Sequence, residues 1–165
     1  MVVVGLKRDR EPVRILTINV RQGGNITAII DDLEDVIHRV IHRRFNFGIP
    51  THRIVTKFKI GKISKGRDGM QNRCNQPDYE GYYDLMLVLY RSSGSARNCS
   101  KVEETLIERF IDNPRCMNKD VNRPGPGTEH DDHAVYLMVR TKWVNEEEEK
   151  QLVSLLNDLR PPSSW

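Results

Sequence analysis

The chain has 165 residues, of which 30% are charged and 38% are hydrophobic, a balance that is typical of a globular domain and excludes a disordered or fibrous chain. Its length suits one domain with a single buried core, and no apolar run approaches the roughly 20 residues of a membrane-spanning helix. The net charge of +3 is too small to indicate a partner by itself.

The first part of the chain predicts a strand, a helix and a second strand. Residues 13–20, VRILTINV, are rich in β-branched side chains and predict a strand that ends at a Gly-Gly pair. Asn25 or Thr27 then begins a helix, because apolar residues recur at three- and four-residue steps up to the GIP at 48–50. Residues 53–60 are the second predicted strand.

The second part predicts four more elements after a polar, glycine-bearing segment. That segment is expected to hold a short helix around Met70. Residues 84–90, DLMLVLY, form a continuous apolar run, which is typical of a central strand buried on both faces. An amphipathic helix that ends near Asn113 and a strand at 133–142 follow, and Asn145 with four glutamates opens a last helix.

This order predicts one domain over residues 1–165 with an α+β fold: a small mixed, mainly antiparallel sheet flanked by helices. The alternative is a ferredoxin-like βαββαβ sheet with an extra helix. Residues 118–132 carry two prolines and two glycines and form a long loop. Loops of this length are typically functional or flexible.

Positive charge is concentrated between residues 38 and 73, whereas acids collect in the segments DDLED and NEEEEK. A basic segment set apart from acidic ones is typical of a protein that binds a phosphate backbone, so the sequence predicts DNA as a partner and no membrane. A solvated cationic face is the alternative. The candidate nucleic-acid-binding residues are Arg39, Arg43, Arg44, Lys57, Lys62, Lys65 and Arg67.

Three cysteines, odd in number and far apart, predict reduced thiols and an intracellular protein, of the nucleus or of the cytoplasm. Two other patterns suit metal ions. The run EHDDH at 129–133 combines carboxylates and imidazoles, with a solvated loop as the alternative. His38 and His42 lie four residues apart on the first predicted helix, a spacing that can hold a metal ion, and the alternative is a DNA-facing stripe formed by Arg39 and Arg43 beside them.

Five features recur in the order of a known domain: the run KIG at 59–61, a downstream arginine, a buried strand, the helix KVEETLIERF and a closing asparagine. Together they resemble the GIY-YIG nuclease domain, and more specifically its divergent branch in which the second motif is YKIG. The resemblance extends from Phe58 to Asn118 and implies a nuclease-like core over about residues 48–120, with an added strand and helix at each end.

The resemblance implies a role for each matching residue. Gly61 would lie under the substrate phosphate, Arg73 would hold the scissile phosphate, and Lys59 would lie near the substrate backbone. Glu103 would bind a divalent ion, Mg²⁺ or Mn²⁺, and Asn118 would tie the following loop to the site. These residue types suit phosphodiester hydrolysis, which needs cations against the developing charge and a carboxylate-held metal. Arginine pairs with phosphate oxygens through two parallel hydrogen bonds.

The sequence departs from the family pattern at its tyrosines. The first motif is represented only by residues 48–50, which end in proline, and Phe58 and Lys59 occupy the positions where the second motif often has tyrosine. Neither tyrosine that would activate water or brace the phosphate therefore stands where the pattern expects it. The nearby tyrosines lie at other points of the pattern: Tyr79, Tyr82 and Tyr83.

Structural roles are the alternatives for these positions. Glu103 follows Ser100 in an S-x-x-E pattern, which is typical of a helix-capping box. Gly61 suits the end of a strand, and Arg73 suits an exposed surface position. The sequence thus leads to a GIY-YIG-like, metal-dependent DNA endonuclease or a degenerate relative. The alternatives are a non-catalytic nucleic-acid-binding module and a ferredoxin-like interaction domain that forms a homodimer.

Overall fold

The computed structural model describes residues 13–17, 25–42, 53–93, 96–119, 132–143 and 147. The helix expected from Asn145 onward therefore lies outside the described residues, apart from one position. The described elements, in chain order, are β1 (Arg14–Thr17), α1 (Ile26–Ile41), β2 (Arg53–Ile63), α2 (Gly66–Cys74), β3 (Leu85–Ser93), α3 (Ala96–Phe110) and β4 (Asp132–Trp143).

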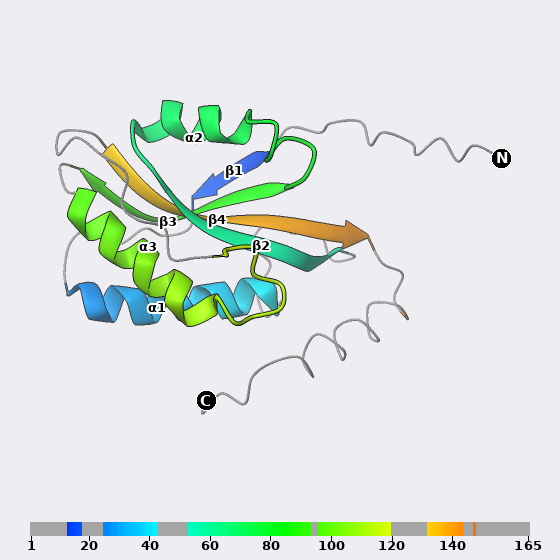
Figure 1. The fold of residues 1–165 in the computed structure, drawn as a ribbon, viewed down its shortest axis with the longest axis horizontal. Helices are drawn as coiled ribbons and strands as arrows, with labels where there is room; N and C mark the ends of the chain where they lie inside the picture. The colour runs from blue at the N-terminus through cyan, green and yellow to red at the C-terminus, as the bar shows by residue number, and fades with distance from the viewer. Residues whose placement is uncertain are drawn as a thin grey trace.

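The strands form one mixed sheet in the order β1-β3-β4-β2, in which β1 is parallel to β3 and the other two pairings are antiparallel. Helices α1 and α3 cover one face of this sheet and α2 covers the other (Figure 1). The α+β class is confirmed. A ferredoxin-like sheet is antiparallel throughout, so the parallel pairing of β1 with β3 shows that this alternative is wrong.

Strand β3 lies in the interior of the sheet and is buried on both faces, as its continuous apolar run predicts. Leu85, Leu87 and Leu89 pack in the layer with α1 and α3. Met86 and Val88 pack in the layer with α2. Successive side chains of a strand point to opposite faces, so one apolar segment supplies both layers of the core.

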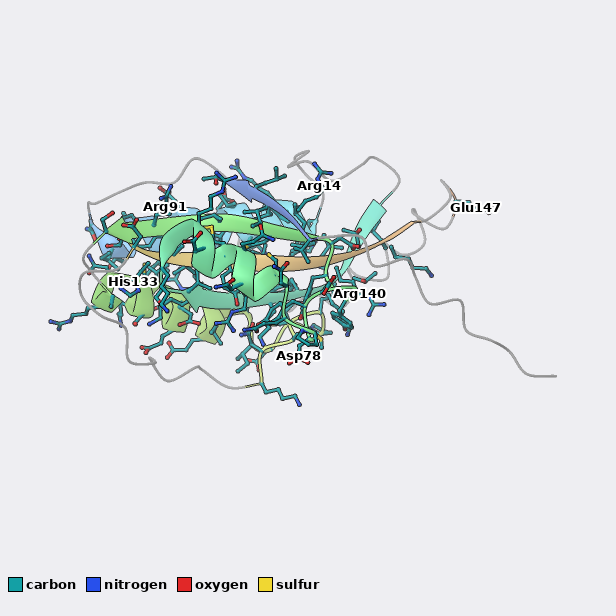
Figure 2. The ribbon with its side chains drawn as sticks, turned by 90° about the horizontal axis from the view of Figure 1, so that it is seen from above. Arg14, Asp78, Arg91, His133, Arg140 and Glu147 are labelled. Atoms are coloured by element: carbon teal, nitrogen blue, oxygen red, sulfur yellow. The ribbon has the colours of Figure 1, made fainter. Side chains whose placement is uncertain are left out.

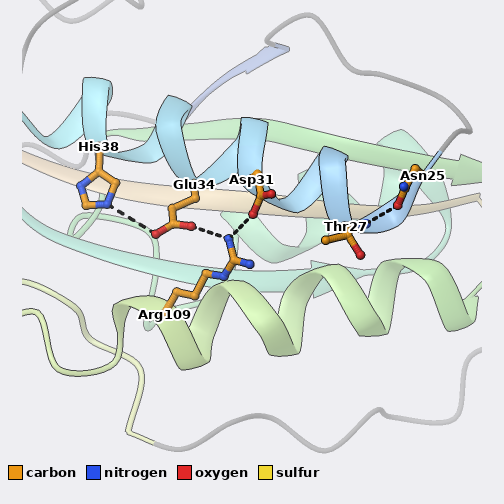
Figure 3. Close-up of polar contacts among 6 residues, drawn as sticks. All are labelled: Asn25, Thr27, Asp31, Glu34, His38 and Arg109. Carbon is orange, nitrogen blue, oxygen red and sulfur yellow. Dashed lines mark hydrogen bonds and ion pairs between the residues drawn. The ribbon is translucent and has the colours of Figure 1, made fainter. Parts of the chain in front are cut away.

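Helix α1 begins where the sequence predicts, because the Asn25 side chain accepts a hydrogen bond of 3.0 Å from the Thr27 backbone N–H. Its apolar stripe packs on the sheet and against α3. Arg109 of α3 bonds Asp31, at 2.8 Å, and Glu34, both on α1, and so links the two helices (Figure 3). No helix in the described part of the chain is long and apolar enough to cross a membrane.

The outer edge of β2 is covered by the segment that follows α3. The Phe58 N–H donates to the Arg115 carbonyl at 3.0 Å, and the Met117 N–H donates to the Phe58 carbonyl at 2.8 Å. The Asn118 side chain continues this pairing by accepting from the Ile60 N–H at 2.9 Å and donating to the Ile60 carbonyl at 2.8 Å. An edge that would otherwise expose unpaired backbone groups is thereby closed over these residues.

Arg115 holds this segment in place from inside the protein. Its guanidinium is buried and donates to the carbonyl of Ile41 at 2.8 Å and, more weakly, to that of Val55 at 3.4 Å. Burial lowers the pKa of Arg115 to about 10. The cation lies at the C-terminal end of α1, where the helix dipole favours positive charge, and it connects α1 to β2.

Candidate functional site

The site centres on Tyr136 of β4, whose ring lies against the backbone of Gly61 on the neighbouring strand β2. The two residues are directly opposite each other in the antiparallel register. A Cβ atom built on Gly61 would lie 2.3 Å from the Tyr136 hydroxyl oxygen and 2.5 Å from Cζ. Glycine is therefore required here for space. The strand continues through it to Ile63, so the interpretation of Gly61 as a strand end is wrong.

Tyr79, from the turn after α2, joins this centre. Its hydroxyl lies 3.5 Å from the Tyr136 hydroxyl. Two cations lie over its ring: Lys59 Nζ is 5.4 Å and Arg73 Cζ is 5.8 Å from the ring centroid. Lys59 precedes Gly61 by two positions on β2 and so shares its face of the sheet, while Arg73 comes from the last turn of α2.

The surroundings of the two tyrosines shift their pKa values in opposite directions. Burial raises the pKa of Tyr79, but the hydrogen bond with Tyr136 and the positive charges of Lys59 and Arg73 outweigh burial and lower the pKa below its ordinary value. Burial raises the pKa of Tyr136 well above its ordinary value, and the charge of Tyr79 adds to this. These opposite pKa shifts favour Tyr136 as the donor and the Tyr79 oxygen as the acceptor of their hydrogen bond.

Glu103 lies on α3, on the opposite face of the sheet from α2 and Tyr79. Its carboxyl group is buried on α3, and its negative charge contributes to the raised pKa of Tyr136, so the two groups lie within electrostatic range. The capping interpretation of Glu103 is wrong, because α3 begins at Ala96 and Ser100 lies inside the helix. The Ser100 hydroxyl instead accepts a hydrogen bond of 2.8 Å from Lys62 Nζ.

A pocket of about 450 Å³ opens beside the tyrosine pair. Its walls combine cations, aromatic rings and polar side chains. The residues that line it are Lys59, Arg73, Gln76, Asp78, Tyr79, Tyr82, Tyr83 and Met117. Tyr136 is 1% exposed and does not line the pocket, so Tyr79 is the member of the pair that faces it. Such a pocket suits a phosphate group with an attached planar ring.

The predicted site residues Lys59, Gly61 and Arg73 thus come together around Tyr79 and Tyr136, whereas Glu103 lies on the opposite face of the sheet and does not line the pocket. Asn118 lies next to them, because its amide pairs with the backbone of Ile60, and it ties the segment after α3 to the strand that carries Gly61.

The predicted nucleic-acid-binding residues do not form one surface. Arg39 lies on α1, on the opposite side of the sheet from α2, and pairs with Asp35 at 2.7 Å. Lys62 turns to α3. Lys65 and Arg67 are exposed at the start of α2. Lys57 lies on β2, two positions before Lys59, whereas Arg43 and Arg44, like the degenerate first motif at 48–50, lie outside the described residues.

The histidines of α1 lie in the contact between α1 and α3. The rings of His38 and His42 are stacked at 6.0 Å, and the His38 ring lies 4.9 Å from that of Phe110. His38 also approaches Glu34 at 3.9 Å (Figure 3). The His38 ring thus packs against α3, whereas Arg39 of the expected DNA-facing stripe is partly exposed and Arg43 lies outside the described residues.

The run at 129–133 is only partly described. Asp132 accepts a hydrogen bond of 2.7 Å from the Ser93 hydroxyl, and His133 is buried near the start of β4. Figure 2 shows His133 and Arg140 toward opposite ends of this strand. Among the described residues no three metal-ligating side chains lie together.

Magnesium is nevertheless compatible with the donor set, because Mg²⁺ keeps several waters and takes one or two carboxylates together with substrate phosphates. The carboxylate of Glu103 is a ligand type that Mg²⁺ and Mn²⁺ take, but Glu103 does not line the pocket that Lys59 and Arg73 line. A single carboxylate does not fit zinc, which takes three or four protein ligands.

Two residues of the candidate site were missed from the sequence. Tyr136 follows the KIG motif by more than seventy positions, so local spacing gives no hint of it. Tyr79 was set aside because it lies at the wrong point of the linear pattern, although the turn after α2 brings it to Arg73 and Lys59. The available signal was a tyrosine in the middle of the apolar strand AVYLMVR, because a buried tyrosine hydroxyl usually has a hydrogen-bond partner.

Fold and site together define a small α+β domain with a cationic, tyrosine-lined pocket. Comparison with known proteins returned no relative: no protein-family model, no curated protein and no solved structure matches the chain.

Proposed function

We propose that this protein is a GIY-YIG-like, metal-dependent DNA endonuclease that hydrolyses phosphodiester bonds at the pocket beside Tyr79. The observation that carries the proposal is the convergence of Lys59 and Arg73 on the ring of Tyr79, whose hydroxyl lies 3.5 Å from that of Tyr136. Cations beside an ionisable hydroxyl are the groups that phosphodiester hydrolysis requires.

The resemblance expects a tyrosine in the first motif, at the start of a strand, and residues 48–50 lack it. Tyr136 supplies a tyrosine from another strand, because β4 pairs with β2 and places the ring on Gly61. The hydroxyl comes from the last described strand instead of the first part of the chain. This supports an active member of the family over a degenerate one.

Each group then has a distinct task. Arg73 and Lys59 bind the scissile phosphate and offset the charge that develops on it. Tyr79, whose pKa is lowered and whose side chain lines the pocket, would act as a tyrosinate base: Tyr136 stabilises the deprotonated Tyr79 oxygen by donating its hydrogen bond, and that oxygen then takes a proton from the attacking water and becomes neutral. The resemblance makes Glu103 the ligand of Mg²⁺ or Mn²⁺, which would offset charge on the phosphate, but Glu103 does not line the pocket.

The test is cleavage of supercoiled and branched DNA in the presence of Mg²⁺ or Mn²⁺. We expect Arg73→Ala, Glu103→Gln and Tyr79→Phe each to slow cleavage by about 100-fold or more. Arg39→Ala is the matched control, because this arginine lies on α1, away from the pocket, and should cut normally. Cleavage that is unaffected by both Arg73→Ala and Glu103→Gln would refute the proposal.

A non-catalytic nucleic-acid-binding module is the second candidate. The observation that favours it is that no three metal-ligating side chains lie together among the described residues, and that Glu103 does not line the pocket. This candidate predicts DNA binding that weakens steeply with salt, because released counterions drive such binding, and no cleavage with any divalent ion.

A further inference from the structure

We infer that the pocket between Tyr79 and Tyr82 binds one unpaired base of a nucleic-acid strand. The substrate is then single-stranded or locally opened at the site, and a continuous duplex is excluded. The binding of a phosphate by the cations rests on the proposed function. The stacking of a base rests on the aromatic wall of the pocket and is tested separately.

Tyr82 provides a fixed, flat wall. Its side chain is partly exposed and lines the pocket. The Arg140 guanidinium lies 4.3 Å from the centroid of its ring, and Arg140 is not among the residues that line the pocket, so this cation supports the ring from the side away from the cavity. The Tyr83 ring meets it edge to face at 4.8 Å. A ring held in this way loses little entropy when a second planar group stacks on it.

The remaining walls match the other parts of a nucleotide. Lys59 and Arg73 lie over Tyr79 and suit a phosphate group. Gln76 and Asp78 supply amide and carboxylate groups that can pair with the edge of a base. The volume of about 450 Å³ lies in the range of small-ligand pockets. A base inside a duplex is stacked on both faces, so only an unpaired base can enter.

A free mononucleotide has the same chemistry, but the cations beyond the pocket favour a strand. Arg67 and Lys65 are exposed at the start of α2, and Arg73 is in its last turn. With a rise of about 1.5 Å per residue, Arg67 and Arg73 are roughly 9 Å apart along the helix axis. A mononucleotide needs only the cations at the pocket, whereas a strand carries further phosphates that Arg67 can meet.

The experiment measures binding by fluorescence anisotropy with the full chain and without divalent ions. The probes are a labelled single strand of thymidine, the same strand with abasic sites in place of its bases, and a blunt duplex. We expect the base-bearing strand to bind about tenfold more tightly than the abasic strand and more tightly than the duplex, which is the effect of stacking one base. Equal affinities for the two single strands would overturn the inference, and this comparison needs no variant.

Substitution of Tyr82 locates the effect. Tyr82→Leu should reduce the affinity for the base-bearing strand to that of the abasic strand and leave abasic binding unchanged, whereas Tyr82→Phe should retain the tenfold preference. Arg73→Ala should weaken both single strands alike. An equal loss on both strands in Tyr82→Leu, or displacement of the strand by thymidine 5′-monophosphate at equal concentration, would overturn the inference.

Addition of Mg²⁺ separates the two proposals. Base-dependent binding without any cleavage refutes the endonuclease and leaves the base pocket. Cleavage of base-bearing and abasic strands at equal rates, with equal affinities, refutes the base pocket and leaves the endonuclease.

Discussion

Replacement of Gly61 by alanine tests the contact on which the site is built. Gly61 has no left-handed backbone conformation, so an alanine can adopt its geometry. In open space such a substitution would stabilise the fold by roughly 0.4–1 kcal/mol, because alanine restricts the unfolded chain. The ring of Tyr136 reverses this expectation, since the new Cβ would lie 2.3 Å from its hydroxyl oxygen and 2.5 Å from Cζ.

These separations are far below the roughly 3.5 Å of carbon–carbon contact, so the ring must move. Tyr136 is 1% exposed and packed among other core residues, and forced shifts of this kind cost about 1–3 kcal/mol. Part of this cost is offset by the stabilisation that alanine gives by restricting the unfolded chain. We therefore expect Gly61→Ala to lower the free energy of unfolding by about 1–2 kcal/mol. The hydrogen bond between Tyr79 and Tyr136 should be lost as well.

The assay is urea denaturation of Gly61→Ala, Tyr136→Val and the double variant. Valine removes the ring, so Gly61→Ala in the Tyr136→Val background should be neutral or stabilising. The two substitutions should therefore be coupled by at least about 1 kcal/mol. A stabilising Gly61→Ala in the otherwise unchanged protein, or the same cost in both backgrounds, would refute the close approach of ring and backbone.

Three further predictions concern individual side chains. Arg115→Met should cost about 2–4 kcal/mol in urea denaturation, because two buried carbonyls lose their donor, whereas Arg39→Met, which removes an exposed ion pair, should cost no more than about 0.5 kcal/mol. Arg109→Ala should cost about 0.5–1 kcal/mol, and a cost that does not shrink with added salt would contradict the ion-pair explanation. In an alkaline absorbance titration the first tyrosine should ionise below the ordinary tyrosine pKa, and this ionisation should be absent from the curve of Tyr79→Phe. Because folding lowers the pKa of Tyr79, its ionisation stabilises the fold at pH values above the pKa of the unfolded chain, and this stabilisation is lost as the pH falls through the pKa of the folded protein.

The elements were largely predictable because their signals are local. The apolar stripe of α1 and its cap at Asn25 lie within a few residues of each other, and the central position of β3 follows from its unbroken apolar run. The predicted end of β2 at residue 60 was wrong, because the strand continues through Gly61 to Ile63. A glycine in a sequence more often marks a turn than a place where another side chain packs closely on the backbone. The order of the strands was not predictable, since β4 pairs with β2, and that pairing joins segments separated by more than seventy residues.

The site depends on a register that no local pattern sets. In β4, Val135, Leu137 and Val139 face α1 and α3, and the residues between them face α2. Both sets are apolar, so alternation alone does not say which set lies over the KIG strand, and a slip of one residue would place Val135 or Leu137 over Gly61. Two side chains resolve the choice: only glycine leaves room for the Tyr136 ring, and only this register brings its hydroxyl to Tyr79. The glycine in β2 and the buried tyrosine in β4 therefore explain each other, but this can be recognised only when the pairing of the two strands is known.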